Sequence, residues 1–341
     1  MAEPFSLLQE LGLEPSAVRQ PFGVLHGCVV TEPHVSAAGE HSRLISELVT
    51  AAQLLRARMA PPHFPMALVA DTTYTLRTLY AANYARLWDR HVRVKNPQNA
   101  TERWRQRAME RRVRPEVSAS WIWKLATFSL TPFNATLYLD ADVLVLSRFY
   151  ARDLLTNSLR VSDIAAPTDP ARQAGRPPAY HRLHELDHGI PMPCAGVMAY
   201  RLGANGVQSF LDRVAWRLSS GRDETKLAAR YRVGDQEVMW EELWRVESAD
   251  ALPRLLLLPD EYLCPFYRQT ARTLLTGADP DADARKKLVG ADATATWKTS
   301  WGSYSCHALH GHVEKYFSST KEEGYEILNL TAYRPRWPPA T

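Results

Sequence analysis

Apolar residues along this chain fall into two patterns. Short continuous apolar runs occur at 66–71 (MALVAD) and at 136–146 (TLYLDADVLVL). Runs of this length, bounded by polar turns, are typical of strands covered on both faces, as in parallel sheets. The other strands expected on this basis begin at Gly23 (GVLHGCVVTE) and Arg254 (RLLLLPDEYL) or cover 162–168 (SDIAAPT) and 194–201 (CAGVMAYR).

Helical spacing of apolar residues separates these runs. In 41–59 the apolar side chains recur every three or four residues, which predicts an amphipathic helix. Segments 121–130 and 205–220 also predict helices, and 90–116, rich in arginine, predicts a surface helix and loop. Strands that alternate with helices indicate an α/β fold with a mainly parallel sheet flanked by helices.

The chain is long enough for one large domain, and neither an internal repeat nor a linker interrupts it. We expect a lead-in at 1–20, a single domain at 21–320 and a tail at 321–341. A long loop rich in Pro, Arg and His, at about 169–193, stands out because loops of that length in a compact domain often have a function.

The run at 136–146 contains two acids, Asp140 and Asp142, between apolar blocks. In an extended strand, residues i and i+2 project to the same side, so both carboxylates would point at one spot. Buried like charges that close require a cation or a shared proton. Carboxylates suit hard ions, so we expect Mn²⁺ or Mg²⁺ here. Asp281 and Asp283 have the same spacing, but they lie in a polar stretch and predict a solvated loop.

Charge and composition exclude some classes of function. The formal net charge is +4, and no dense run of Lys and Arg suggests a nucleic-acid partner. The chain has no apolar run of membrane-spanning length and no signal-peptide pattern, so the compartment, cytoplasmic or Golgi-luminal, stays open. The four cysteines, expected to be reduced, are widely spaced: Cys28, Cys194, Cys264 and Cys306.

Three further groups of residues are candidates for chemistry. His307, His310 and His312 lie within six residues, and imidazole can complete a metal site begun by carboxylates, with His310 preferred. Asp235 and Gln236 open a helical segment, where Asp235 either caps the helix or faces a pocket with Gln236. Lys124, on an apolar helix, either reaches solvent or pairs with a phosphate.

The order of these motifs resembles that of GT-A nucleotide-diphospho-sugar glycosyltransferases, including the glycogenin-like family 8. KLATFSLTPFNATLYLDADVLVL resembles the strand with the D-x-D motif and the lysine helix before it. GVLHGCVVTE and MALVAD resemble the first two nucleotide-binding strands, and SDIAAPT, CAGVMAYR, GDQEVMW, RLLLLPDEYLCPFY and LHGHVEKY follow in the family's order. The resemblance spans about residues 23–316.

The resemblance implies a metal-dependent transferase that moves a sugar from a nucleotide-diphosphate donor, UDP-linked, to a hydroxyl acceptor with retention. The acceptor would be a glycan, a protein or a small molecule. Asp235 and Gln236 would be catalytic, and Asp140, Asp142 and His310 would bind the metal. The donor would be held by residues near the strand ends: Gly27, Cys28, Val29, Asp71, Lys124, Asp140, Ala141, Asp142 and Cys194.

This chain departs from the family pattern at Cys194, where an asparagine near the donor sugar is usual, and in the irregular spacing around His310. Two other classes of protein stay open. Haloacid-dehalogenase-like phosphatases also use a D-x-D strand, but they need a second acid four residues after Asp235, which is absent. A non-catalytic binding module with the same fold is the third interpretation.

Overall fold

The structure is a computed structural model of the 341-residue chain. It describes residues 5–31, 38–60, 63–110, 119–168, 192–204, 206–220, 235–245, 253–259, 262–265, 295–299, 302–306 and 308–310. Most of the expected loop at 169–193, all of the tail at 321–341, and His307 and His312 lie outside these ranges.

A seven-stranded mixed sheet forms the centre of the molecule, in the order β3-β2-β1-β4-β7-β6-β8. Only β7 runs antiparallel to its neighbours β4 and β6, and the other strands of this sheet are parallel. We call the edge where β1, β2, β4 and β6 end and β7 begins the carboxyl edge. The bounds are β1 Gln20–Cys28, β2 Met66–Asp71, β3 Arg90–Val94, β4 Phe133–Leu139, β6 Ile164–Pro167, β7 Val197–Arg201 and β8 Leu255–Leu258.

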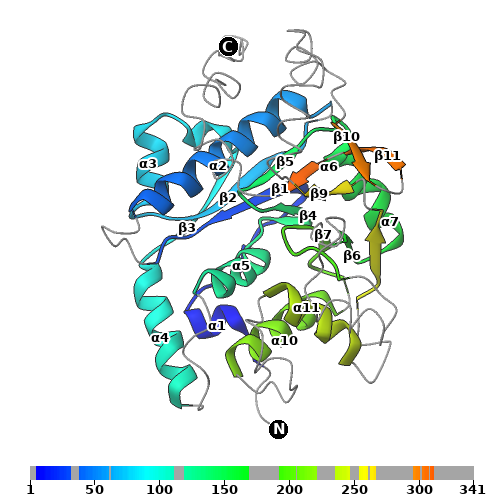
Figure 1. The fold of residues 1–341 in the computed structure, drawn as a ribbon. Helices are drawn as coiled ribbons and strands as arrows, with labels where there is room; N and C mark the ends of the chain where they lie inside the picture. The colour runs from blue at the N-terminus through cyan, green and yellow to red at the C-terminus, as the bar shows by residue number, and fades with distance from the viewer. Residues whose placement is uncertain are drawn as a thin grey trace.

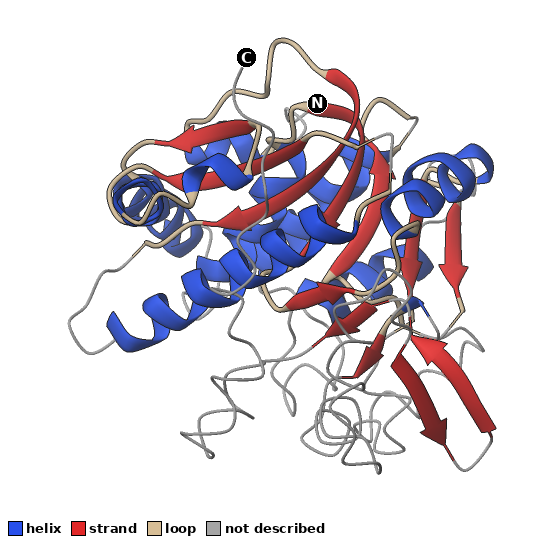
Figure 2. Ribbon diagram, turned by 90° about the horizontal axis from the view of Figure 1, so that it is seen from above, coloured by secondary structure: helices blue, strands red, loops and turns tan. Residues whose placement is uncertain are grey.

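Helices cover both faces of this sheet, as Figures 1 and 2 show. Strand β1 illustrates why: Val24 and Cys28 join one buried apolar cluster with α2 and α3, while Leu25 joins the other with α1, α4, α5, α10 and α11. The bounds are α1 Leu7–Leu11, α2 Ala38–Arg58, α3 Thr75–Ala81, α4 Pro97–Glu110, α5 Ala119–Ser129, α10 Val207–Ser220 and α11 Asp235–Arg245. Short helical turns occur at η2 Ala85–Leu87, α6 Tyr150–Arg152, η3 Asp153–Ser158 and α7 Leu159–Val161.

A second, three-stranded sheet lies beyond the carboxyl edge, in the order β5-β12-β9. Its central strand, β12 (Ala308–His310), pairs antiparallel with β5 (Val143–Val145) on one side and parallel with β9 (Cys264–Pro265) on the other. An antiparallel hairpin, β10 (Ala295–Thr299) and β11 (Gly302–Cys306), precedes β12. Segments more than 160 residues apart in sequence therefore lie side by side next to β4 (Figure 1).

The expected α/β fold with a mainly parallel sheet is confirmed, and β2 has the predicted bounds. Two element predictions are wrong. The surface segment 90–116 begins with a strand, β3, whose two Arg side chains and one His side chain are tolerated because it is an edge strand of the sheet. The strand expected over 136–146 is broken after Leu139, and a turn separates β4 from β5.

The lead-in packs against the domain through α1. Leu7, Leu8 and Leu11 are buried, and the backbone N–H of Leu7 donates to Oδ1 of Asp212 on α10 at 3.1 Å. The domain boundary placed at residue 20 stays a prediction, although this contact shows that the first helix contributes to the same core.

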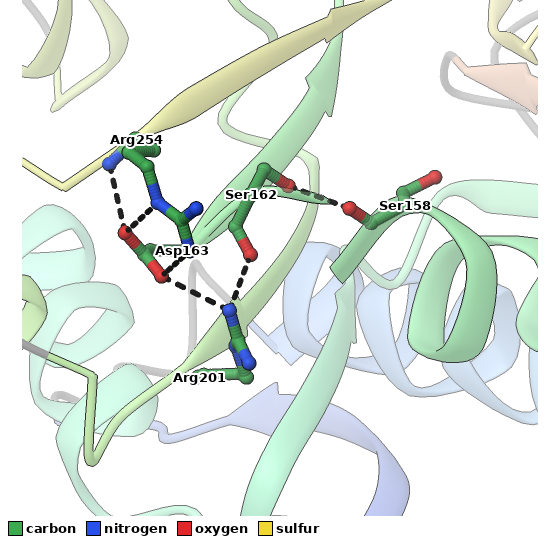
Figure 3. Close-up of polar contacts among 5 residues, drawn as sticks. All are labelled: Ser158, Ser162, Asp163, Arg201 and Arg254. Atoms are coloured by element: carbon green, nitrogen blue, oxygen red, sulfur yellow. Dashed lines mark hydrogen bonds and ion pairs between the residues drawn. The ribbon is translucent and has the colours of Figure 1, made fainter. Parts of the chain in front are cut away.

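The edge of the sheet opposite the carboxyl edge is held by one acid, Asp163, which immediately precedes β6 (Figure 3). Its carboxylate accepts hydrogen bonds from the backbone N–H of Arg254 at 3.0 Å and from the guanidinium of that residue at 3.1 Å. Nη2 of Arg201, the last residue of β7, donates to the same carboxylate at 3.1 Å. Asp163 thus joins the ends of β6, β7 and β8.

Candidate active site

The first acid of the D-x-D segment lies at the carboxyl edge. The backbone N–H of Asp140 donates to the carbonyl of Gly196 at 2.8 Å, and the N–H of Val143 donates to the carbonyl of Asp140 at 3.1 Å. The second bond closes a turn over Ala141 and Asp142, so the two acids do not project from one continuous strand as expected. They share a tight turn between β4 and β5, because the chain leaves the central sheet here.

Asp140 has a cation and a hydroxyl as partners. Nζ of Lys124 lies 2.8 Å from its Oδ2, and the hydroxyl of Tyr138 donates to its Oδ1 at 2.6 Å. The side chains of Lys124 and Asp140 are 16% and 22% exposed, which makes this ion pair partly shielded from water. The cation that a partly buried Asp140 requires is therefore supplied by the chain itself in this structure.

Lys124 is positioned by the close packing of α5 on β1. A Cβ added at Gly27 would lie 2.8 Å from Cγ2 and 2.9 Å from Oγ1 of Thr127, so only glycine permits this approach. Oγ1 of Thr127 also donates to the carbonyl of Trp123 within α5 at 2.8 Å. Gly27, predicted as a donor-binding residue, thus sets the distance between β1 and the helix that carries Lys124.

The turn before β7 connects Asp140 to α11. The N–H of Ala195 donates to Oε1 of Gln236 at 3.1 Å, and the N–H of Cys194 donates to the carbonyl of Pro167 at 2.7 Å. Cys194 is buried, 1% exposed. The structure therefore brings Gln236, Cys194 and the backbone of Asp140 to the same edge. Asp235 is the first residue of α11, and the structure describes only its backbone.

The ends of β1 and β2 are joined by the buried Asp71. Its carboxylate accepts hydrogen bonds from the backbone N–H groups of Val30 at 3.0 Å, Tyr74 at 2.7 Å and Thr75 at 3.2 Å. These bonds tie the segment after β1 to the start of α3, a contribution that the sequence did not reveal.

Two more predicted donor-binding residues lie at this edge: Cys28 is the last residue of β1, and Val29 follows it. Cys28 is buried, and its Sγ lies 3.7 Å from Oγ1 of Thr75. Burial raises the pKa of the Cys28 thiol to about 12, so it stays protonated at neutral pH. Val29 is partly buried against the apolar cluster on the α5 side.

The carboxylates of the turn between β4 and β5 are the groups that could bind a metal ion. The register of the second sheet pairs His310 with Val143, the residue after Asp142, so the backbone of His310 lies beside the D-x-D turn. The carboxylates of Asp140 and Asp142 are the hard oxygen ligands that Mn²⁺ and Mg²⁺ prefer, and each oxygen can accept more than one bond. Among the described side chains, which do not include that of His310, no group of three His, Cys, Asp or Glu residues gathers for a metal.

Sequence reasoning missed Tyr138 and the backbone of Ala195 and Gly196. Tyr138 could have been found: it precedes Asp140 by two positions, and side chains two apart on a strand share a face. The ring of Tyr138 is buried against Phe128 at 4.6 Å between ring centroids, which fixes the direction of its hydroxyl. The backbone contacts follow from the strand order, which no local pattern contains.

Comparison with solved structures identifies the fold. The sequence matches no family model and no curated protein. The structure is similar to mouse xyloside xylosyltransferase 1, with a TM-score of 0.50 and 12% identity over 86% of this chain and 98% of that one. It is equally similar to an active-site mutant of the galactosyltransferase LgtC, with a TM-score of 0.50 and 12% identity over 93% of this chain and 98% of that one.

The fold is therefore that of GT-A glycosyltransferases, as the order of motifs predicted. Among the described helices, none is both long and apolar enough to cross a membrane.

Proposed function

We propose that this protein is a metal-dependent glycosyltransferase that moves a sugar from a UDP-linked donor to a hydroxyl acceptor. The observation that carries the proposal is the meeting of Asp140, Lys124 and Gln236 at the carboxyl edge of a GT-A sheet. Ligands of open α/β sheets bind beyond the carboxyl ends of the strands, where these residues lie.

The donor's diphosphate would lie against the acidic turn and Lys124. Asp140 and Asp142, with His310 from β12, would hold Mn²⁺ or Mg²⁺, which would neutralise the charge of the departing diphosphate. Lys124 would supply a second positive charge to the phosphates. Gly27, Cys28 and Val29, together with Asp71, would shape the edge where the nucleotide binds, and Ala141 and Cys194 would lie beside the donor.

Gln236 would act at the sugar. We propose retention of the anomeric configuration, in which the acceptor attacks from the side that the diphosphate leaves and the leaving phosphate accepts the acceptor's proton. Gln236, with Asp235, would then stabilise the positive charge that develops on the sugar. The active-site mutant of LgtC carries glutamate in place of a glutamine, which supports a role for a glutamine side chain in a protein of this fold.

The acceptor would be a glycan, a protein or a small molecule. A mouse enzyme with this fold is named for the transfer of xylose to a xyloside, and LgtC is named as a galactosyltransferase. Both names describe the transfer of a sugar, and for this chain we propose the transfer of a sugar to a hydroxyl acceptor.

Calorimetry of UDP binding with and without Mn²⁺ tests the metal and the donor together. We expect Asp140→Ala and Asp142→Ala each to abolish the Mn²⁺-dependent part of UDP binding while the protein stays folded. Asp281→Ala with Asp283→Ala is the matched control, since these acids have the same spacing in a polar stretch. Unchanged Mn²⁺-dependent affinity in both Asp140 and Asp142 variants would refute the proposal.

The phosphatase interpretation predicts a different product. A haloacid-dehalogenase-like enzyme would release inorganic phosphate from phosphate monoesters and lose this activity with Asp140→Ala. We expect no such release of phosphate, and we expect sugar transfer from a UDP-sugar instead. NMR of the anomeric proton of the product then determines its configuration. If the protein neither transfers nor hydrolyses UDP-sugars in the presence of Mn²⁺, that result would favour the interpretation as a non-catalytic binding module.

A further inference from the structure

Lys124 and a divalent cation need the same carboxylate. Nζ of Lys124 lies 2.8 Å from Oδ2 of Asp140, and both side chains are largely shielded from water. The backbone of Asp140 is held at both its N–H and its carbonyl, which fixes the position from which the carboxylate projects. A cation bound to this carboxylate would lie close to the ammonium group, and like charges at such distances repel strongly where water is scarce.

Tyr138 restrains the arrangement further. Its hydroxyl donates to Oδ1 of Asp140 at 2.6 Å, and its ring lies 5.8 Å from Nζ of Lys124. Because the ring is buried against Phe128, neither the hydroxyl nor the ring face can move far. Lys124, Tyr138 and Asp140 therefore form one compact group, which we call the Lys124 triad.

We propose that Lys124 is a positioning residue that blocks cation binding at Asp140 until a diphosphate is present. The inference rests on the proposed function, because the diphosphate is the anion that would attract Lys124 away from Asp140. With the phosphates bound, the ammonium gains a new partner and Asp140 becomes available to the cation. The protein would thus take up nucleotide and metal together and bind little metal alone.

Removing the charge of Lys124 should raise the affinity for Mn²⁺ alone and lower the affinity for UDP in the presence of Mn²⁺. Lys124→Met keeps the length of the side chain and removes the charge, so we expect it to bind Mn²⁺ alone roughly tenfold more tightly, the usual size of coupling between two ligands. The same variant should bind UDP with Mn²⁺ more weakly, since the phosphates lose a cation. A role in folding alone would weaken both.

Two variants serve as controls, and a third as a backup. Lys124→Arg keeps the charge and should bind Mn²⁺ alone as weakly as the wild type. Arg160→Met removes one exposed positive charge from α7, at the opposite edge of the sheet. It should leave the affinity for Mn²⁺ alone within about twofold of the wild type, since salt screens the interaction between distant exposed charges. Lys124→Gln replaces Lys124→Met if the latter does not fold.

Free Mn²⁺ measured by electron paramagnetic resonance reports the first affinity, and calorimetry with UDP the second. Equal or weaker Mn²⁺ binding by the neutral Lys124 variants, including no binding by any variant, overturns the inference. If the wild type binds no UDP with Mn²⁺ while the Lys124 variants still gain affinity for Mn²⁺ alone, the proposed function fails and the competition at Asp140 stands.

Discussion

At the scale of single residues, two acids at opposite edges of the sheet both pair with basic side chains but differ in how fully their carboxylates are hydrogen-bonded. Asp163 is buried and receives four hydrogen bonds from two arginines, one of them through the backbone (Figure 3). Asp140 is more exposed and receives two side-chain hydrogen bonds, from Lys124 and Tyr138. Asp163 is saturated and links strands, whereas Asp140 keeps accepting capacity for a ligand.

Asp163 predicts how stability depends on pH. The side-chain hydrogen bonds from Arg254, and to a smaller extent the charge of Arg201, hold the pKa of Asp163 below its ordinary value. A lowered carboxylate pKa stabilises the folded state above the unfolded pKa, roughly pH 4, and that contribution is lost as pH falls through the folded pKa. Asp163→Asn should therefore lower the free energy of unfolding at pH 7 by about 1–3 kcal/mol.

Urea denaturation measures this difference, and we expect it to narrow below about pH 4 as Asp163 is protonated in the wild type. Asp153→Asn is the control, because the contacts of Asp153 with Arg152 and Asn157 are exposed and local. A difference between wild type and Asp163→Asn that is independent of pH would show that the charge of Asp163 contributes nothing.

Gln236 carries the chemical prediction at this scale. Gln236→Ala should slow turnover by about one to three orders of magnitude, the size of losing one electrostatic contact, with little change in donor affinity. The structure adds a second expectation, since Oε1 of Gln236 accepts the N–H of Ala195. Gln236→Glu keeps an acceptor for this N–H. If Gln236→Ala loses stability and Gln236→Glu does not, the lost stability comes from the hydrogen bond to the turn at Ala195. Full turnover in Gln236→Ala would contradict the assignment.

At the scale of elements, α5 and β1 form one unit through Gly27. The Cβ clash with Thr127 means that a side chain at position 27 must push α5 away, and Lys124 moves with it. Gly27→Ala should cost about 1–3 kcal/mol of stability, as overpacking usually does, and also weaken UDP binding. Gly203→Ala is the matched control, because no atom lies within 4 Å of an added Cβ there.

Thermal denaturation and calorimetry with UDP test both parts of this prediction. Thr127→Ala removes the two atoms that the new methyl would meet most closely, so it should rescue part of the loss in the double variant with Gly27→Ala. Wild-type stability in Gly27→Ala would mean that α5 can shift without cost, and the positioning of Lys124 by Gly27 would then be wrong.

At the scale of the whole molecule, chain segments far apart in the sequence lie side by side beyond the carboxyl edge. Strand β12, near residue 310, pairs with β5, which follows the D-x-D turn. A late strand can reach this point only because the chain leaves the central sheet at Asp140 and exposes β5 to a second sheet. The candidate metal ligands therefore come from two separate regions of the chain.

The same pairing gives the histidine prediction its physical basis. Replacing His310 with Ala should weaken Mn²⁺ binding in the presence of UDP more than replacing His307 or His312, since the backbone of His310 lies beside Val143. Calorimetry of the three variants measures this order. If His312→Ala is the weakest binder, the metal ligand lies two residues later in the chain than we expect.

Local patterns in the sequence already determined much of this fold. The apolar runs predicted β2 with its bounds and the amphipathic helix that became α2, because burial on one or both faces leaves a periodic mark. The D-x-D segment was recognised as unusual for a similar reason, since acids between apolar blocks require partners. The edge strand β3 was not predicted, because a strand at the edge of a sheet can carry charged side chains and then lacks a continuous apolar run.

Only the tertiary structure decided which groups meet. That the partner of Asp140 is Lys124, that the turn at Ala195 contacts Gln236, and that β12 lies beside β5 depend on strand order and register. Strand order is set by packing and hydrogen bonds between residues far apart in the sequence, which leave no periodic pattern in either segment. The sequence by itself therefore determined the candidate residues, and the fold determined their partners.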